Sequence, residues 1–292
     1  MTRLEQALKR EEFVVTGEIG PPKGVNLEKC LNDAQMLRDQ VVAVNVTDLQ
    51  SAVMRIGSMA VCAKLVERDV EPIYQLTCRD RNRLALQSDL LSAWALNIGN
   101  VLCLTGDHPS LGDHVEAKPV YDFDSVQLLK AADTLNRGCD MAEHELDGKP
   151  DFFLGAVVTP ASEPIEPQII KMEKKIQAGA KFFQTQAVYE TEKFEQFMNR
   201  AQAFRIPVLA GMVILKGAGM AKFMNEHVAG ISVPDNIINE MEQTKSEDRK
   251  KKAVEITARL IRDIKPLCQG IHLMPLGWDE LVPEIINEAE LS

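Results

Sequence analysis

Three polar residues stand at or just after the ends of short strand-like runs of this sequence, namely Glu18, Asp107 and Gln186. Glu18 comes directly out of an apolar run and precedes two prolines. A carboxyl group in such a place is partly desolvated, and desolvation favours the protonated form that can donate a proton. We therefore interpret Glu18 as a candidate general acid. The alternative is a carboxylate that pairs with a base at the rim of a site.

Asp107 and Gln186 have side chains that suit a polar ligand. Asp107 follows Gly106, which permits a sharp turn and a close approach of a ligand to the backbone. An aspartate that bonds its own backbone in a turn is the alternative. The Gln186 amide offers donors and acceptors together, which suits the edge of a heterocycle. A polar residue satisfied at the rim of the fold is the alternative for Gln186.

The histidines and cysteines predict no metal site. None of the histidines is spaced like a metal-binding pair, and the six cysteines form no CxxC pair. Wide cysteine spacing in a long chain also argues against a disulfide framework. We expect only one histidine near the site and the others to be structural or solvent-facing; the first is His108 and the others are His114, His144, His227 and His272.

Eight short β-branched runs alternate with segments of helical periodicity. The predicted strands are Phe13–Glu18, Val41–Val46, Glu71–Leu76, Asn100–Leu104, Phe152–Val158, Lys181–Gln186, Pro207–Val213 and Gly270–Met274. Between the last two strands we predict two helices, Gly217–Glu226 and Asp248–Ile264. Strict alternation implies parallel strands with crossover helices.

Eight such units predict an α/β fold, a (β/α)8 TIM barrel that forms a single domain over residues 1–292. An open doubly wound sheet is the alternative, but it would more naturally carry a glycine-rich dinucleotide motif after its first strand. The segment 17–22 is not such a motif. In barrels the active site lies at the C-terminal ends of the strands, where Glu18, Asp107 and Gln186 stand. The long connection His108–Phe123 is a candidate binding loop at that end.

Composition narrows the class of protein. The net charge of −10 disfavours a nucleic-acid binder, which would normally carry a basic excess. The N-terminus lacks a signal-peptide core, and no run approaches the roughly 18 apolar residues that span a bilayer. We expect a cytoplasmic protein that binds neither nucleic acid nor membranes.

Five short blocks, taken together and in order, resemble the methylenetetrahydrofolate reductase family. The blocks are Gly17–Pro22, Val44–Thr47, Gln75–Cys78, Leu104–Asp107 with Pro109, and Gly179–Gln186. The resemblance spans nearly the whole chain. It implies an eight-fold barrel with a non-covalent flavin, FAD in most members, with FMN as the alternative.

The resemblance also implies residue roles. Glu18 matches the general acid, Asp107 the aspartate beside flavin and pterin, and Gln186 the glutamine on the folate pterin. Flavin-contacting positions match Thr47, Gln75, Leu104, Thr105, Gly106, Asp107, Tyr121 and, on the phosphate side, Lys175. The implied reaction passes a hydride from reduced flavin to 5,10-methylenetetrahydrofolate and yields 5-methyltetrahydrofolate. Protonation by Glu18 of the leaving nitrogen would open the bridging ring first.

Three departures from bacterial members of that family bear on the electron donor. Gln75 stands where many have a histidine, Ala218 lies near the place of an aromatic residue, and Gly277-Trp278 lies near the place of an Asn-Arg pair. The last two departures argue against direct oxidation of NAD(P)H.

The ending Met274–Glu280 resembles the flavoprotein subunit of acetogenic anaerobes, which works beside an iron–sulfur and zinc partner subunit. We expect such a partner and an oligomer. Two other functions stay open: a pterin-binding barrel methyltransferase that exchanges a methyl group with a corrinoid protein, and a non-catalytic folate-binding subunit.

Overall fold

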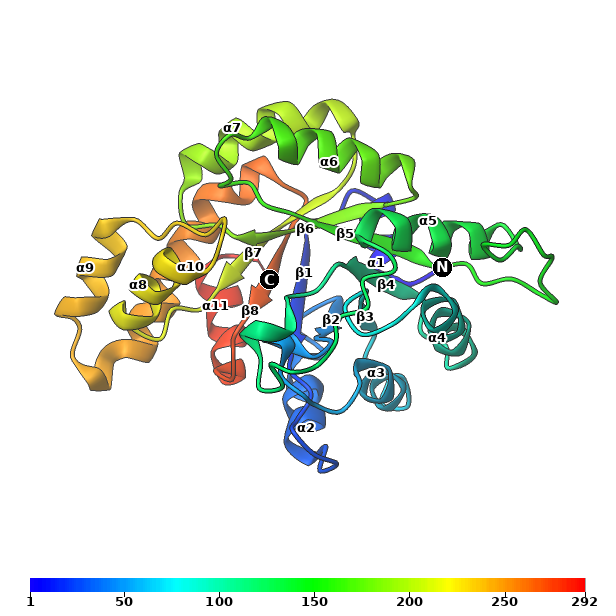
Figure 1. Cartoon of the computed structure of the whole chain (residues 1–292). Coiled ribbons are helices and arrows are strands. Elements are labelled where there is room, and N and C mark those ends of the chain that lie inside the picture. Colours follow the sequence, from blue (N-terminus) through cyan, green and yellow to red (C-terminus); the bar gives the residue numbers. More distant parts are fainter. Residues whose placement is uncertain (292) are drawn as a thin grey trace.

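The computed structural model describes residues 1–291, and its strands close into the predicted barrel. Neighbouring strands pair in chain order, all in parallel, and β8 returns to β1 (Figure 1). The strands are β1 (Val14–Ile19), β2 (Ala43–Val46), β3 (Pro72–Thr77), β4 (Asn100–Leu104), β5 (Phe153–Val158), β6 (Phe182–Ala187), β7 (Val208–Val213) and β8 (Gly270–Met274). The predicted α/β fold is confirmed.

Strand boundaries agree with the prediction to within one or two residues. The largest difference is in β2, which begins at Ala43 and not at Val41. The amide of Val41 donates to the carbonyl of Leu37 at the end of the preceding helix, so this residue still belongs to the helix-terminating turn. Apolar character alone does not separate such a turn from a strand.

Helices surround the barrel (Figure 1). They are α2 (Glu28–Leu37), α3 (Ser58–Val66), α4 (Arg83–Ala95), α5 (Ser125–Asn136), α6 (Glu166–Gln177), α7 (Thr191–Ala201), α8 (Ala218–His227), α9 (Asp235–Gln243), α10 (Arg249–Ile264) and α11 (Val282–Glu288). Local sequence fixes several starts; for example, Asp124 and Gln127 form a capping box at α5. None of the helices within residues 1–291 combines the length and apolar character needed to cross a membrane.

Helix α9 was not predicted. It lies beside α8, and the two form one edge of the molecule in Figure 1. The helix follows Pro234 and buries Ile237, Ile238 and Met241. That spacing is helical, so the sequence held a signal that was missed because the segment is short and acidic.

The N-terminal helix α1 (Arg3–Lys9) closes the end of the barrel opposite the strand C-termini. Leu4 and Leu8 are buried in one apolar cluster with Val14 from β1 and with the stacked rings of Phe153 and Phe182. Figure 1 shows α1 behind the strands. This layer seals the barrel with apolar side chains, and polar groups can therefore be reached only from the other end.

The next layer of the barrel interior is polar, whereas bulky branched apolar residues fill most barrels of this type. Its buried polar side chains are hydrogen-bonded to one another, and they are Thr16, Asn45, Gln184 and His272. Each of these residues lies two positions before a residue that lines the cavity at the end of the same strand. Because side chains alternate along a strand, both residues of such a pair point into the barrel. They form a floor beneath the C-terminal face.

Candidate active site

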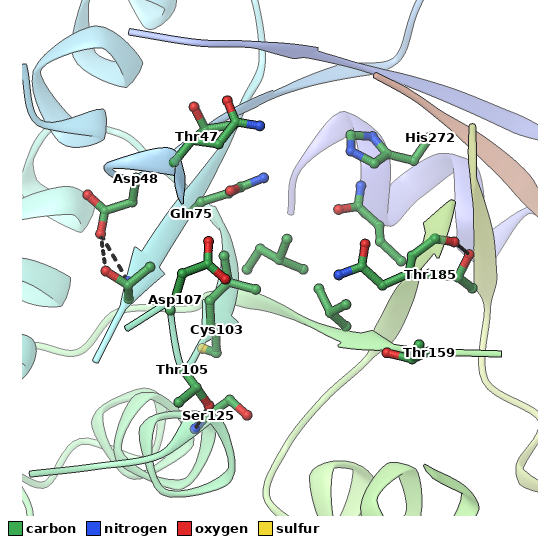
Figure 2. Close-up of a pocket in the computed structure, with 18 of the residues that line it drawn as sticks. Thr47, Asp48, Gln75, Cys103, Thr105, Asp107, Ser125, Thr159, Thr185 and His272 are labelled. Atoms are coloured by element: carbon green, nitrogen blue, oxygen red, sulfur yellow. Dashed lines mark hydrogen bonds between the residues drawn. The ribbon is translucent and has the colours of Figure 1, made fainter. Parts of the chain in front are cut away.

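A cavity of about 410 Å³ opens at the C-terminal ends of the strands, and Figure 2 shows the side chains around it. Its volume lies within the range of about 300–1,000 Å³ that small-molecule sites occupy. Nine predicted site residues line it, namely Glu18, Thr47, Gln75, Leu104, Thr105, Gly106, Asp107, Lys175 and Gln186. The barrel therefore brings together residues that are spread over most of the sequence.

Tyr121 lies behind this lining. Its hydroxyl donates to the carbonyl of Gly106 at 3.2 Å, so it supports the turn that carries Asp107. Gly106 has a φ of +88°, and a Cβ there would lie 3.0 Å from the Cβ of Thr77. The turn thus requires glycine for its backbone conformation and for its close approach to β3.

Glu18 is only 8% exposed, and one carboxyl oxygen has two polar neighbours. Its Oε2 accepts from the amide Nε2 of Gln75 at 3.3 Å and lies 3.4 Å from Nε2 of His272. Within residues 1–291, no lysine or arginine forms an ion pair with Glu18. The other oxygen, Oε1, makes no hydrogen bond within residues 1–291.

His272 corrects the expectation that this histidine is structural or solvent-facing. It is 3% exposed, lines the cavity, and places its imidazole between Glu18 and Thr16. Its Nδ1 lies 3.0 Å from Oγ1 of Thr16. No local signal could have placed His272 here, because its contact with Thr16 depends on the register of β1 against β8 across the barrel closure. Thr16 lies two residues before Glu18 on the same face of β1.

The predicted neighbour His108 lies outside the cavity lining. Its ring is exposed, and Nδ1 lies 2.9 Å from the hydroxyl of Ser110. The same nitrogen accepts from the Ser110 amide at 3.2 Å, which caps the short helix Pro109–Leu111. His108 therefore organises the loop after β4.

Asp48 lines the cavity but is fully engaged by the fold. Its carboxylate accepts from the amide and hydroxyl of Thr77 at 3.0 and 2.8 Å and pairs with Arg81 at 2.7 Å. Figure 2 shows the contact between Asp48 and the neighbouring strand end. A buried carboxylate with this many donors fixes the ends of β2 and β3, and we assign it a structural role.

Asp107 and Gln186 differ from Asp48 because their polar ends are free. Asp107 is exposed and Gln186 is half-buried, and neither side chain makes a hydrogen bond to another described residue. The register of β6 against β7 shifts between Gln184 and Ala187, the stretch that contains Gln186. In Figure 2, Asp107 and Thr185, the residue before Gln186, lie on different sides of the cavity. The arrangement leaves a carboxylate and an amide available to a ligand.

Lys175 is a buried cation. It is 7% exposed, and its ammonium donates to the carbonyl of Val157 at 2.6 Å. Burial, with a smaller contribution from Lys171, lowers the pKa of Lys175 to about 8. An ammonium has three donors and this one has a single protein acceptor, so the site is suited to an anion such as a phosphate.

The hydroxyls of Thr47 and Thr105 both line the cavity, but the fold satisfies only one of them. The Oγ1 of Thr105 accepts from the amide of Ser125 at 3.2 Å and so holds the start of α5. The Oγ1 of Thr47 is buried, lines the cavity and has no partner in the part of the chain that is described. Because an unpartnered buried hydroxyl is costly, its position favours a ligand that supplies the missing hydrogen bond.

The described residues 1–291 contain no group of three histidine, cysteine, aspartate or glutamate side chains that could hold a metal ion. The six cysteines are free, and five of them are buried. Burial raises the pKa of Cys30 and Cys78 to about 11 and about 12, so these thiols stay protonated at neutral pH.

The chain matches known proteins along its length. Residues 3–290 match the family model described as methylenetetrahydrofolate reductase. Methylenetetrahydrofolate reductase 2 of Schizosaccharomyces pombe is 24% identical over 254 residues, which cover 78% of this chain and 37% of that protein. The probable methylenetetrahydrofolate reductase (NADPH) of Caenorhabditis elegans is 22% identical over 310 residues, which cover 99% of this chain and 44% of that protein. The chain spans less than half the length of these relatives.

A solved structure supports the fold assignment. It is a Clostridium thermocellum protein that binds two copies of 5-methyl-5,6,7,8-tetrahydrofolic acid, and it matches with a TM-score of 0.62 at 18% sequence identity. The match covers 99% of this chain and 98% of that one. At this identity the likeness shows the shared barrel.

Proposed function

This chain belongs to the methylenetetrahydrofolate reductase family, and from that premise we propose that it reduces 5,10-methylenetetrahydrofolate to 5-methyltetrahydrofolate with a bound flavin. The observation that carries the proposal is the buried carboxyl of Glu18, which lines a cavity in which the side chains of Asp107 and Gln186 are free to bind a ligand. The whole chain would act as one flavin- and folate-binding catalytic domain.

The residues of the cavity fit a flavin on two observations. Thr47 carries a buried hydroxyl without a partner, and Lys175 carries a buried ammonium with one acceptor. The first suits a polar edge of the ring system, and the second suits a phosphate. The residues that would hold the flavin are Thr47, Gln75, Leu104, Thr105, Gly106, Asp107, Tyr121 and Lys175. When bound, the flavin would supply the hydride; FAD is our first choice and FMN the alternative.

Asp107 and Gln186 would bind the folate. A pterin presents adjacent donors and acceptors, and an amide can satisfy both kinds of group at once. The carboxylate of Asp107 accepts hydrogen bonds and would recognise the donors of a heterocycle. Folate binding by the Clostridium thermocellum protein with the same barrel supports this part of the proposal.

Glu18 would protonate the leaving nitrogen of the folate. Its Oε2 is held by Gln75 and faces His272, whereas its Oε1 has no partner within residues 1–291. The carboxyl is thus fixed through one oxygen and can present a proton on the other. Protonation of the nitrogen makes opening of the bridging ring easier, and a positioned acid contributes about 10²–10⁴-fold.

Electrons would reach the flavin from an iron–sulfur and zinc partner subunit. Two positions are expected to receive a nicotinamide, and they hold Ala218, in α8, and Trp278, after β8. Trp278 does not line the cavity, and its ring lies 5.5 Å from the ammonium of Lys216 and 5.8 Å from that of Lys250. We also propose that the chain works in the cytoplasm and as part of an oligomer.

Absorbance spectroscopy tests the cofactor directly. We expect purified protein, or protein reconstituted with FAD or FMN, to show the flavin bands and to lose them on anaerobic addition of a chemical reductant. Addition of 5,10-methylenetetrahydrofolate should then restore the oxidised spectrum. Protein that binds neither flavin contradicts the proposal, and methyl transfer from 5-methyltetrahydrofolate to a corrinoid protein would replace it with the methyltransferase function.

A further inference from the structure

Two buried amides lie in the polar layer beneath Glu18. Asn45 on β2 is 0% exposed and Gln184 on β6 is 1% exposed. They pair reciprocally across the barrel: Nδ2 of Asn45 donates to Oε1 of Gln184 at 2.7 Å, and Nε2 of Gln184 donates to Oδ1 of Asn45 at 3.0 Å. Neither amide reaches the Glu18 carboxyl directly, so any effect on it must pass through other groups.

The connecting group is the hydroxyl of Thr16. The second hydrogen on Nε2 of Gln184 is donated to Oγ1 of Thr16 at 3.3 Å. Thr16 is therefore an acceptor toward Gln184 and must direct its own proton elsewhere. Two acceptors are in reach: Nδ1 of His272 at 3.0 Å and the carbonyl of Ile271 at 3.5 Å. The shorter contact favours donation to Nδ1.

Donation from Thr16 fixes the proton on the imidazole. A neutral imidazole has one N–H and one lone pair, so a ring that accepts at Nδ1 carries its hydrogen on Nε2. Nε2 is the nitrogen that faces Oε2 of Glu18, at 3.4 Å. The N–H of His272 then points toward Glu18, and Nε2 has no lone pair with which to take a proton from it.

We propose that Asn45 and Gln184 are positioning residues that hold His272 in the Nε2–H tautomer and so keep the proton of Glu18 available to the substrate. In the opposite tautomer, Nε2 would accept the acidic proton and direct it away from the cavity. A carboxylate would select Nε2–H unaided, but the protonated acid would not. The amide pair therefore acts in the state in which Glu18 must donate. This catalytic consequence rests on the proposed function; the tautomer does not.

The tautomer can be measured by ¹⁵N NMR of the imidazole nitrogens in the full-length, flavin-free chain. Glu18→Gln provides a neutral side chain in place of the protonated acid, and loss of one resonance set in His272→Asn assigns the ring. In the Glu18→Gln protein at a pH where the ring is neutral, we expect a protonated Nε2 and an unprotonated Nδ1. A protonated Nδ1 in this protein overturns the proposal.

Removal of the amide donor gives the second arm. Adding Gln184→Leu to Glu18→Gln should produce a substantial Nδ1–H population, because Oγ1 of Thr16 can then accept from the ring. Gln177→Leu, the same change at an exposed site on α6, should leave the tautomer unchanged. If the Gln184→Leu protein does not fold, Gln184→Met in the Glu18→Gln background makes the same test, because it removes the amide donor, keeps the length of the side chain and leaves Oγ1 of Thr16 in place. An unchanged tautomer in the variant that folds also overturns the proposal.

Kinetics connect the tautomer to catalysis. With Glu18 intact, Gln184→Leu should lower kcat for folate reduction roughly tenfold or more, a part of the about 10²–10⁴-fold that a positioned acid contributes. KM and flavin affinity should stay within about twofold, since Gln184 is argued to act through Thr16 and His272. A protein with the expected tautomer but no flavin would refute the proposed function alone, whereas a wild-type kcat in this variant would refute the positioning role.

Discussion

Lys175 carries a charge in a buried position. Burial of the charge costs stability, whereas the charge itself favours the binding of an anionic ligand. Burial lowers the pKa of its ammonium from 10.5 to about 8, so the folded chain binds this proton less tightly than the unfolded chain does. The stability deficit is therefore fully present below about pH 8 and disappears as the pH rises toward 10.5. Such a cost is typical of a residue kept for ligand binding.

Replacement of this cation gives the first prediction. Lys175→Met should raise the stability of the flavin-free chain at pH 7, by an amount on the order of 3 kcal/mol at most, while it weakens flavin binding. Denaturant titration from pH 7 to 10.5 should show the difference from wild type shrinking as the pH rises. Lys174→Met, at the exposed neighbouring position on α6, should change neither property. A stability gain that does not depend on pH would contradict the assignment of the deficit to the buried charge.

Flavin affinity of the wild-type chain should also depend on pH. Because the pKa of Lys175 is about 8, the ammonium loses its proton as the pH rises through that value, and attraction to a flavin phosphate falls. Fluorescence titration between pH 6.5 and 9.5 should show weakening binding above about pH 8. The same affinity across this range would mean that Lys175 does not contact the phosphate.

Single residues differed in how well the sequence predicted them. Glu18, Asp107 and Gln186 could be predicted to line the cavity because each stands at or just after the end of a predicted strand. His272 could not be found in this way, since it lies inside a strand and its role depends on register with Thr16 across the β1–β8 closure. That closure joins residues far apart in the sequence.

The strands position the site through the shape of the barrel interior. Gly155 on β5 leaves room for the ring of Phe182 on β6, and a Cβ at Gly155 would lie 2.3 Å from Cζ of that ring. Phe182 lies in the apolar layer that supports the polar layer, and Gly155 lies beside it. The floor of the cavity therefore depends on a small residue in one strand facing a large one in the next.

Filling this space gives the prediction at the scale of elements. Gly155→Ala should destabilise the chain by about 1–3 kcal/mol, because an overpacked core forces side chains or backbone to shift. Gly57→Ala is the control, since a Cβ there meets nothing within 4 Å and the residue has an ordinary φ of −61°. Urea unfolding measures both. Equal effects of the two changes would show that the Phe182 ring moves freely and does not define the floor.

Elements were predictable wherever their own periodicity was strong. All eight strands and most helices follow from short β-branched runs and amphipathic spacing. The start of β2 and the presence of α9 were missed, since a helix-terminating turn and a short acidic helix give weak local signals. The register shift between Gln184 and Ala187 is a property of strand pairing and has no signal in one strand alone.

At the scale of the whole molecule, the barrel was predictable from alternation, whereas its chemistry depends on what binds to it. The polar cavity lies at the end of the barrel opposite α1, and its bound groups would come from solution or from a partner. The sequence predicted which strand ends contribute to the cavity. It did not predict the buried polar layer, which forms only when four strands close around the same level.

The electron donor is a question at this scale. We expect NADH or NADPH alone to reduce the bound flavin much more slowly than a reduced iron–sulfur partner subunit does, because Ala218 offers no aromatic surface for a nicotinamide. Anaerobic spectra recorded with each donor, with and without co-purifying protein, measure this difference. Rapid reduction by NADH or NADPH alone would show that the partner is not needed.

The most direct test of the account is anaerobic stopped-flow oxidation of the reduced flavin by 5,10-methylenetetrahydrofolate in wild type and in Glu18→Gln. We predict rapid oxidation in wild type and a rate about 10²–10⁴-fold lower in the variant, with flavin affinity unchanged. Glu192→Gln, an exposed position on α7, should behave as wild type. Equal rates in wild type and Glu18→Gln, or no oxidation of the wild-type flavin by the folate, would contradict it.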